Sequence, residues 1–169
     1  MEISAFAEEI LRHGTFAVYP VNPISRHGNP VNVKRCEDED EMVLETRKSI
    51  EKWLQEGRET IAAICRDEKE ASELRKRLGD KLPIEDSDPD TADFTKGIMV
   101  LPVEYTKGLE FDAVLLYHPS AGHYPVEDRH VKLLYVAATR ALHELAVVHQ
   151  GDLTDLIAKP VSEKNKRCA

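Results

Sequence analysis

Four short apolar runs along the chain have no polar face. A strand has this pattern when it lies inside a parallel sheet, because helices cover both of its faces. We therefore predict buried strands at Thr60–Cys65, Gly97–Val103, Asp112–Tyr117 and Glu144–His149. A fifth segment, Val31–Cys36, alternates apolar and polar residues and predicts a strand with one exposed face.

Between these runs, apolar residues recur at helical spacing, with Asp67 as an N-cap and Gly57 and Gly79 as stop signals. The predicted helices are Glu2–Arg12, Glu39–Gln55, Glu68–Leu78, Glu127–Ala141 and a short one at Leu153–Ala158. Loops are predicted at 22–30, 82–95 (with a short strand near 83–85) and 118–126, and residues 162–169 as a frayed tail. Alternating strands and helices predict an α/β fold with a parallel sheet and helices on both faces.

Length and composition place the chain among ordinary globular proteins. Its 169 residues suit a single domain, residues 1–169, and 41% of them are hydrophobic and 32% charged. No apolar run approaches the roughly 18 residues that span a bilayer, and no signal peptide opens the chain. Cys36, Cys65 and Cys168 fit neither a disulfide framework nor a zinc site. We therefore expect a cytoplasmic protein without membrane contact.

The formal net charge of −8 bears on possible partners. A protein that holds nucleic acid mainly through phosphates is usually basic. We therefore expect this chain alone to bind DNA or RNA weakly, so that another part of the protein would complete any nucleic-acid track.

The segment TKGLEFDAV, Thr106–Val114, lies between two predicted strands. Gly108 allows a tight turn or the close approach of a ligand. Lys107 and Glu110 flank it, and a glutamate can accept hydrogen bonds from sugar hydroxyls. The segment alone is equally consistent with two charged residues on an exposed turn.

Two arginines lie near the ends of predicted elements. Arg140 follows Thr139 among small residues in LLYVAATRALHEL, Leu133–Leu145, and a forked guanidinium suits a phosphate. Arg66 follows a buried strand in IAAICRDEKEASEL, Ile61–Leu74. Alone, Arg140 is also explained by favourable interaction with a helix C-terminus, and Arg66 by a solvated loop.

Together, in this order, the three segments resemble motifs of superfamily 1 helicases of the UvrD/Rep type, in their second, C-terminal RecA-like domain. IAAICRDEKEASEL resembles motif IV, TKGLEFDAV motif V and LLYVAATRALHEL motif VI. The motif-bearing core would cover residues 60–149. Residues 2–12 resemble the lead-in helix from the junction between the two motor domains.

The resemblance implies a RecA-like fold of the P-loop NTPase type that lacks its own phosphate-binding loop. ATP with Mg²⁺ would be bound mainly by an N-terminal RecA-like domain of the same protein. Arg140 would be an arginine finger on the γ-phosphate, and Arg66 a second catalytic contact to the same phosphate. Glu110 would contact the ribose, with Gly108, Lys107 and Thr139 beside the nucleotide. The full-length protein would be an ATP hydrolase, and this chain alone would be inactive.

The chain departs from this family at several points. Neither GxxxxGK[ST] nor an acidic DExx motif is present. Pro102 and Glu104 stand where the family has Thr-x-His touching the nucleic-acid strand, and Cys65 replaces an aromatic residue. About thirty residues separate Arg66 from motif V, too few for the inserted subdomain of UvrD and Rep.

With these departures, the chain resembles the HelD-like branch, whose members work with bacterial RNA polymerase. The leading hypothesis is the C-terminal domain of an ATP-dependent DNA helicase, and the second a HelD-like ATPase that remodels RNA polymerase. A third, of another class, is a non-catalytic interaction module with a helicase-like fold. The presence of Arg66, Glu110 and Arg140 argues against this third hypothesis. His118, His123 and His130 share one region but favour a solvated loop over a metal site.

Overall fold

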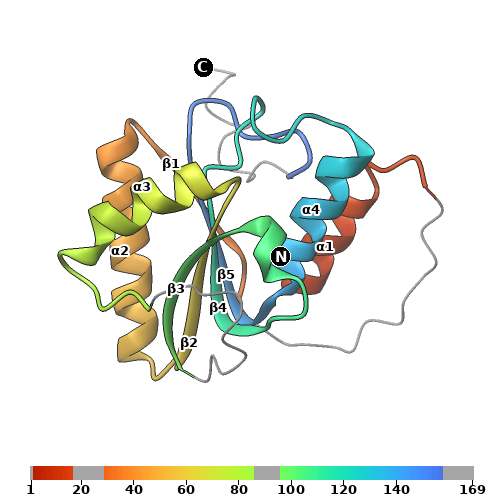
Figure 1. The fold of residues 1–169 in the computed structure, drawn as a ribbon. Coiled ribbons are helices and arrows are strands. Elements are labelled where there is room, and N and C mark those ends of the chain that lie inside the picture. Colours follow the sequence, from red (N-terminus) through yellow and green to blue (C-terminus); the bar gives the residue numbers. More distant parts are fainter. Residues whose placement is uncertain (1, 17–28, 86–95, 158–169) are drawn as a thin grey trace, which may run out of the picture.

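The computed structural model describes residues 2–16, 29–85 and 96–157. In this part of the chain five parallel strands form one sheet, in the order β1-β5-β4-β2-β3 (Figure 1). The strands are β1 (Asn32–Cys36), β2 (Thr60–Cys65), β3 (Gly97–Pro102), β4 (Phe111–Tyr117) and β5 (Ala141–Gln150). The predicted α/β fold with a parallel sheet is confirmed.

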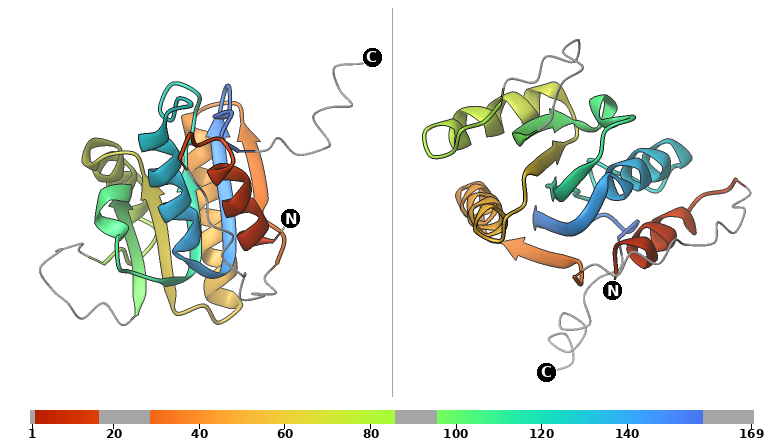
Figure 2. Two further views of the ribbon diagram at one scale, coloured as in Figure 1. Left: turned by 90° about the vertical axis from the view of Figure 1, so that its right-hand side faces the viewer. Right: turned by 90° about the horizontal axis from the view of Figure 1, so that it is seen from below.

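Helices cover both faces of the sheet, as Figures 1 and 2 show. They are α1 (Ile3–Leu11), α2 (Glu39–Gln55), α3 (Glu68–Gly79) and α4 (Asp128–Thr139), with a short 3₁₀ helix, η1 (Val103–Thr106). α2 and α3 lie on one face, and α1 and α4 on the other. Because every strand runs in the same direction, all carboxyl ends lie at one edge of the sheet and all amino ends at the opposite edge.

Aspartates fix where two of the helices begin. The side chain of Asp38 accepts a hydrogen bond from the backbone N–H of Glu41, and that of Asp67 accepts one from Glu70. Each bond satisfies one of the N–H groups that a first helical turn leaves unpaired. α2 and α3 therefore start directly after β1 and β2 end, at the carboxyl edge.

The hydrophobic core has two layers, one on each side of the sheet. Along β4, Ala113 and Leu115 pack on the α2–α3 side, whereas Val114 and Leu116 pack on the α1–α4 side. The register is irregular between Phe111 and Ala113, and Phe111 therefore packs on the α1–α4 side. This irregularity lies directly after the KGLE turn.

Several boundaries differ from the sequence prediction. β5 begins at Ala141, directly after α4, and not at Glu144. The predicted helix at Leu153–Ala158 is wrong over its described residues, 153–157. There, Leu153 bridges Ser120, and the Thr154 N–H donates to the carbonyl of Pro119. The region predicted as a short strand near 83–85 contains a single bridge, from Ile84 to Ile98.

Two further predictions concern the ends and loops of the chain. The tail 162–169 and most of the 82–95 loop lie outside the described residues.

Of the helices in the described ranges, none combines the length and apolar character needed to cross a membrane.

Candidate functional site

The segments around Glu110 and Arg140 meet at the amino edge of the sheet. Each directly precedes a strand, and the two strands, β4 and β5, are neighbours. The Phe111 N–H donates to the carbonyl of Arg140 (2.9 Å), and Nη1 of Arg140 donates to the carbonyl of Leu109 (3.2 Å). Two segments thirty residues apart in the sequence are thus joined by one backbone–backbone hydrogen bond and one bond from the Arg140 side chain.

Arg140 is the C-cap of α4 and is half-buried. Its Nε donates to the carbonyl of Val136 (3.2 Å), and its Nη2 makes a long contact of 3.5 Å with Thr139 Oγ1. A guanidinium has five N–H donors. Together with the bond to Leu109, these contacts occupy three of the five, so the oriented side chain keeps two donors for an external anion.

The turn before β4 leaves room for a ligand. Gly108 has a φ of +81°, a region that favours glycine, and no heavy atom lies within 4 Å of the position that a Cβ would take. Lys107 and Glu110 are exposed, and neither forms an ion pair with another described residue. A carboxylate, an ammonium group and accessible backbone therefore stand beside Arg140.

Asp112 ties this turn to the neighbouring strand β2. Its Oδ2 accepts hydrogen bonds from the backbone N–H groups of Glu59 (2.9 Å) and Thr60 (3.1 Å), and its own N–H donates to Thr60 Oγ1 (2.8 Å). Burial opposes ionisation of the carboxyl, but these hydrogen bonds outweigh it and lower the pKa of Asp112. The start of β4 is therefore fixed on both sides, by Arg140 and by Thr60.

We expect Asp112→Ala to lower the free energy of unfolding by about 1–3 kcal/mol at pH 7, because it leaves two backbone N–H groups without their acceptor. The pKa of Asp112 is lowered in the folded state, so its contribution is complete above the ordinary carboxyl pKa of about 4 and declines as the pH falls through the folded value. Urea unfolding at pH 7 and pH 3 measures both effects. Asp80→Ala, which removes an exposed carboxylate, is the control; an equal loss in both variants would contradict the role of Asp112.

Arg66 lies at the opposite, carboxyl edge. It follows β2, and its Nε and Nη2 donate to Asp67 Oδ2 at 3.0 and 2.7 Å. The six residues of β2 separate the two edges by about 20 Å. The structure therefore places Arg66 and Arg140 at opposite edges of the sheet, and the shared contact to one γ-phosphate stays a prediction. The physical reason for the separation is that Arg66 follows a strand whereas Arg140 precedes one.

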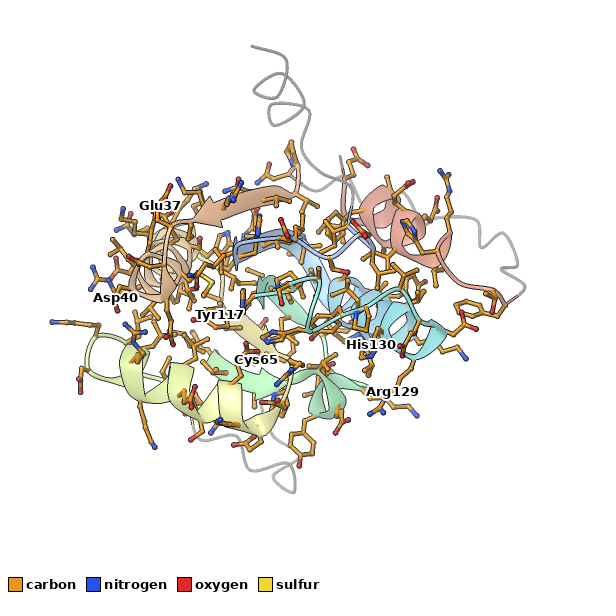
Figure 3. All side chains as sticks on the ribbon, turned by 90° about the horizontal axis from the view of Figure 1, so that it is seen from above. Glu37, Asp40, Cys65, Tyr117, Arg129 and His130 are labelled. Carbon is orange, nitrogen blue, oxygen red and sulfur yellow. The ribbon has the colours of Figure 1, made fainter. Side chains whose placement is uncertain are left out.

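The carboxyl edge has a mixed set of charged groups, seen from above in Figure 3. Glu104 replaces the expected histidine; it is exposed and lies 3.7 Å from Arg129. His118, at a φ of +54°, contacts the ring of His123 edge to face, and burial lowers the pKa of both imidazoles. Among the described residues, no three His, Cys, Asp or Glu side chains are placed to hold a metal ion.

Sequence reasoning missed Glu70 and Tyr117 at this edge. Burial raises the pKa of Glu70 to about 7, and it raises the pKa of Tyr117 above its usual range. In the sequence both residues read as parts of regular elements, Glu70 in an acidic helix start and Tyr117 in an apolar run. Glu70 follows β2, and Tyr117 ends the neighbouring strand β4. The chain continues from β2 to α3 on one face of the sheet and from β4 to α4 on the other, and ligands often bind at such a point. This position was the available signal.

Comparisons with known proteins agree with this architecture. Residues 97–148 match the family described as the UvrD-like helicase C-terminal domain. No curated protein matches the sequence.

Among solved structures, the chain resembles the crystal structure of the C-terminal domain of a possible DNA helicase from Lactobacillus plantarum WCFS1. The two are 27% identical with a TM-score of 0.75, over 92% of this chain and 88% of the other. The chain is therefore similar to helicase C-terminal domains, in sequence to the UvrD-like family over residues 97–148 and in fold over most of its length.

Proposed function

We propose that this chain is the C-terminal motor domain of an ATP-dependent DNA helicase or translocase of superfamily 1. The observation that carries the proposal is the junction of the two motif segments at the amino edge. There the guanidinium of Arg140 is oriented by the Leu109 carbonyl, next to the exposed Glu110. Hydrogen-bond donors suited to a phosphate and an acceptor suited to a sugar hydroxyl thus occupy one surface.

Arg140 would act on the triphosphate of ATP. Phosphoryl transfer spreads negative charge over the transferred oxygens, and a positioned arginine stabilises that charge. The contacts to Val136 and Leu109 hold the guanidinium in place, so little reorganisation is needed when an anion arrives. Lys107 and Thr139 would lie beside the nucleotide. Arg66, which lies at the other edge, remains a proposed second contact to the phosphate, and Arg140 carries the proposal.

The remaining components would come from an N-terminal RecA-like domain of the same protein. That domain would bind most of the ATP and hold its Mg²⁺, because this chain lacks a phosphate-binding loop and its described residues offer no carboxylate cluster for a metal. The residues at the amino edge fit the role of the second side of an ATP-binding cleft between the two domains. Gly108 leaves its backbone open, and Glu110 offers free acceptor oxygens.

We expect Glu110→Ala to raise the KM for ATP about tenfold or more in a protein containing both motor domains. A hydrogen bond from a sugar hydroxyl to a carboxylate is worth about 1.5–3 kcal/mol, and tenfold corresponds to about 1.4 kcal/mol. The measurement compares ATP with 2′,3′-dideoxy-ATP, for which the same substitution should change KM little. An equal rise in KM for both nucleotides would contradict the ribose contact. Glu104→Ala, which removes an exposed carboxylate at the opposite edge, is the control.

A second function, a HelD-like ATPase that remodels RNA polymerase, is favoured by one observation. Glu104 is exposed at the carboxyl edge, where a nucleic-acid strand would otherwise be gripped, and a carboxylate repels phosphate. Strand-displacement and polymerase-binding assays on a protein with both motor domains decide between the two functions. Unwinding without polymerase binding supports the helicase, and polymerase binding without unwinding supports the remodeller. Absence of both would favour a non-catalytic module.

A further inference from the structure

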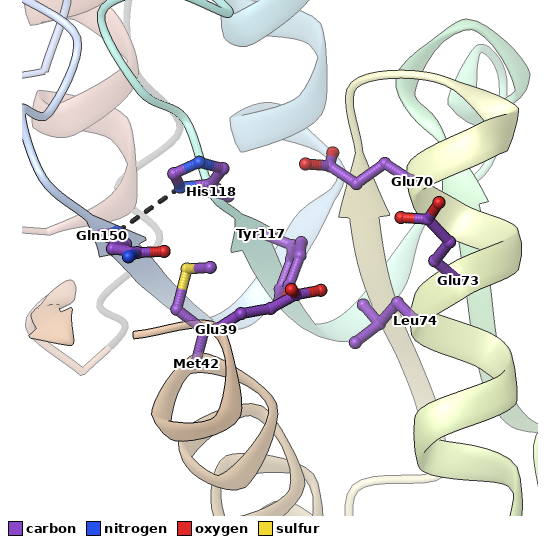
Figure 4. A pocket seen from close by; sticks show the side chains of 8 residues that line it. All are labelled: Glu39, Met42, Glu70, Glu73, Leu74, Tyr117, His118 and Gln150. Carbon is purple, nitrogen blue, oxygen red and sulfur yellow. Dashed lines mark hydrogen bonds between the residues drawn. The ribbon is translucent and has the colours of Figure 1, made fainter. Parts of the chain in front are cut away.

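A cavity of about 180 Å³ opens at the carboxyl edge of the sheet, between the starts of α2 and α3 (Figure 4). Its lining side chains come from α2, α3, the end of β4 and the end of β5, and they surround one common space. These residues are Glu39, Met42, Glu70, Glu73, Leu74, Tyr117, His118 and Gln150. It lies about 20 Å, the length of a six-residue strand, from the edge occupied by Arg140.

The cavity has more negative than positive charge. Glu39 is paired with Arg77 (3.2 Å), but Glu73 has no ion-pair partner in the described part of the chain. Glu70 accepts a hydrogen bond from the Arg66 N–H (2.8 Å) and lies 3.8 Å from Nδ1 of His123. Burial lowers the pKa of that imidazole, so it is mostly neutral at pH 7. Glu73 thus faces the cavity without a cation, and so does Glu70, which is about half ionised at pH 7 because burial raises its pKa to about 7.

Tyr117 provides an independent indication of a ligand. Only 5% of its surface is exposed, yet its hydroxyl forms no hydrogen bond with any described residue, and the side chain lines the cavity. The hydroxyl is not among the fully buried polar atoms of the described residues, so the accessible part of this side chain opens onto the cavity and can bind a ligand there. The aromatic ring and the neighbouring Met42 thioether add a polarisable wall. A hydroxyl acceptor, an aromatic ring and free carboxylates together suit an organic cation.

The spacing of the acids decides which kind of cation fits. A metal ion needs ligands that converge on one point within about 2.6 Å, and no such group exists among the described residues. The two carboxylates without a cation, Glu70 and Glu73, instead stand on α3, and Glu39 on α2 faces them across a space much larger than an ion. A planar guanidinium, with donors directed to several sides, can bridge such acceptors.

We propose that this cavity, here called the acidic cleft (the eight residues above), binds an arginine side chain of a partner polypeptide. Glu73 and Glu70 would accept hydrogen bonds from the guanidinium, and the Tyr117 hydroxyl would complete its coordination. The inference goes beyond the proposed function and does not depend on ATP.

Charge around the cleft favours a basic polypeptide over a small free amine. Glu37 and Asp38 are exposed at the start of α2, beside the mouth, and so is Asp40, which is paired with Arg77; Figure 3 labels Glu37 and Asp40. Such a rim steers a chain with several positive charges and adds little for a single free cation. The net charge of −8 acts in the same direction.

The test uses the 169-residue chain and three probes observed by NMR titration. The probes are the peptide acetyl-Gly-Arg-Gly-amide, the same peptide with citrulline in place of arginine, and spermidine. Citrulline has nearly the same shape but no charge. We expect saturable shifts at the cleft with the arginine peptide and binding weaker by at least about tenfold with citrulline, since a charged hydrogen-bonding pair is worth more than about 1.4 kcal/mol.

Variants of the chain complete the test. Glu73→Gln and Tyr117→Phe each keep the size of the side chain and should each weaken the arginine peptide several-fold, whereas Glu68→Gln, outside the cleft on α3, should not. Equal binding of the citrulline peptide, or unchanged binding by Glu73→Gln, would overturn the proposal. Saturation by spermidine without saturation by the arginine peptide would also overturn it and assign the cleft to a free polyamine.

Discussion

In a protein that contains both motor domains, Arg140→Ala should reduce the turnover number for ATP by about 10³- to 10⁵-fold, the range of arginine fingers. The side chain is held by the carbonyls of Val136 and Leu109, and two of its N–H donors remain free to contact a phosphate. Alanine removes both the positive charge and the forked hydrogen-bond donors of the guanidinium. Steady-state ATP hydrolysis at saturating nucleotide measures the loss.

Two further variants separate chemistry from folding. Arg140→Lys keeps the charge but not the fork, and we expect most of the loss to persist. Arg129→Ala, in the first turn of the same helix at the other edge, should leave turnover unchanged. Unchanged turnover in Arg140→Ala, with an unchanged unfolding midpoint, would refute the finger assignment.

Phe111→Ala should lower the free energy of unfolding by about 3–5 kcal/mol, a large part of the 5–15 kcal/mol typical of a domain. The Phe111 side chain is fully buried on the α1–α4 side, and its removal leaves a cavity beneath the KGLE turn. Urea unfolding followed by circular dichroism measures the change.

The control for this prediction is Tyr105→Ala, six residues earlier. Tyr105 is 53% exposed, so its removal should alter stability by only about 0.5 kcal/mol. A loss of less than about 1 kcal/mol in Phe111→Ala would mean that the site collapses around the missing ring.

The sequence predicted the sheet well because its strands carry an unambiguous pattern. Runs such as TIAAIC are apolar on both faces, and only burial between two helical layers explains them. The start of β5 was placed three residues late. Ala141 and Leu142 are good helix formers, and local preference cannot indicate that hydrogen bonding to β4 takes over directly after Arg140. The 3₁₀ turn η1 and the irregular register at Phe111 also depend on contacts between distant segments.

The candidate site was predictable in part. The KGLE turn and Arg140 both precede strands, and the structure places them together. Arg66 follows a strand and lies at the other edge, so its contact to the same phosphate as Arg140 rests on the motif resemblance alone and stays a prediction. The acidic cleft could not be predicted, because it combines residues from β4, β5, α2 and α3 whose proximity depends on the order of strands in the sheet.

The position of β1 has a consequence for biosynthesis. In the described sheet β1 pairs with β5 alone, Val33 against Val147, and α1 packs on α4 and β5. While a ribosome is still translating the middle of the chain, β2, β3 and β4 can already assemble, but the first helix and strand cannot. The apolar side chains of Ile3, Phe6 and Ile10 therefore stay uncovered until first α4 and then β5 emerge, so a hydrophobic surface is exposed while most of the chain is being made.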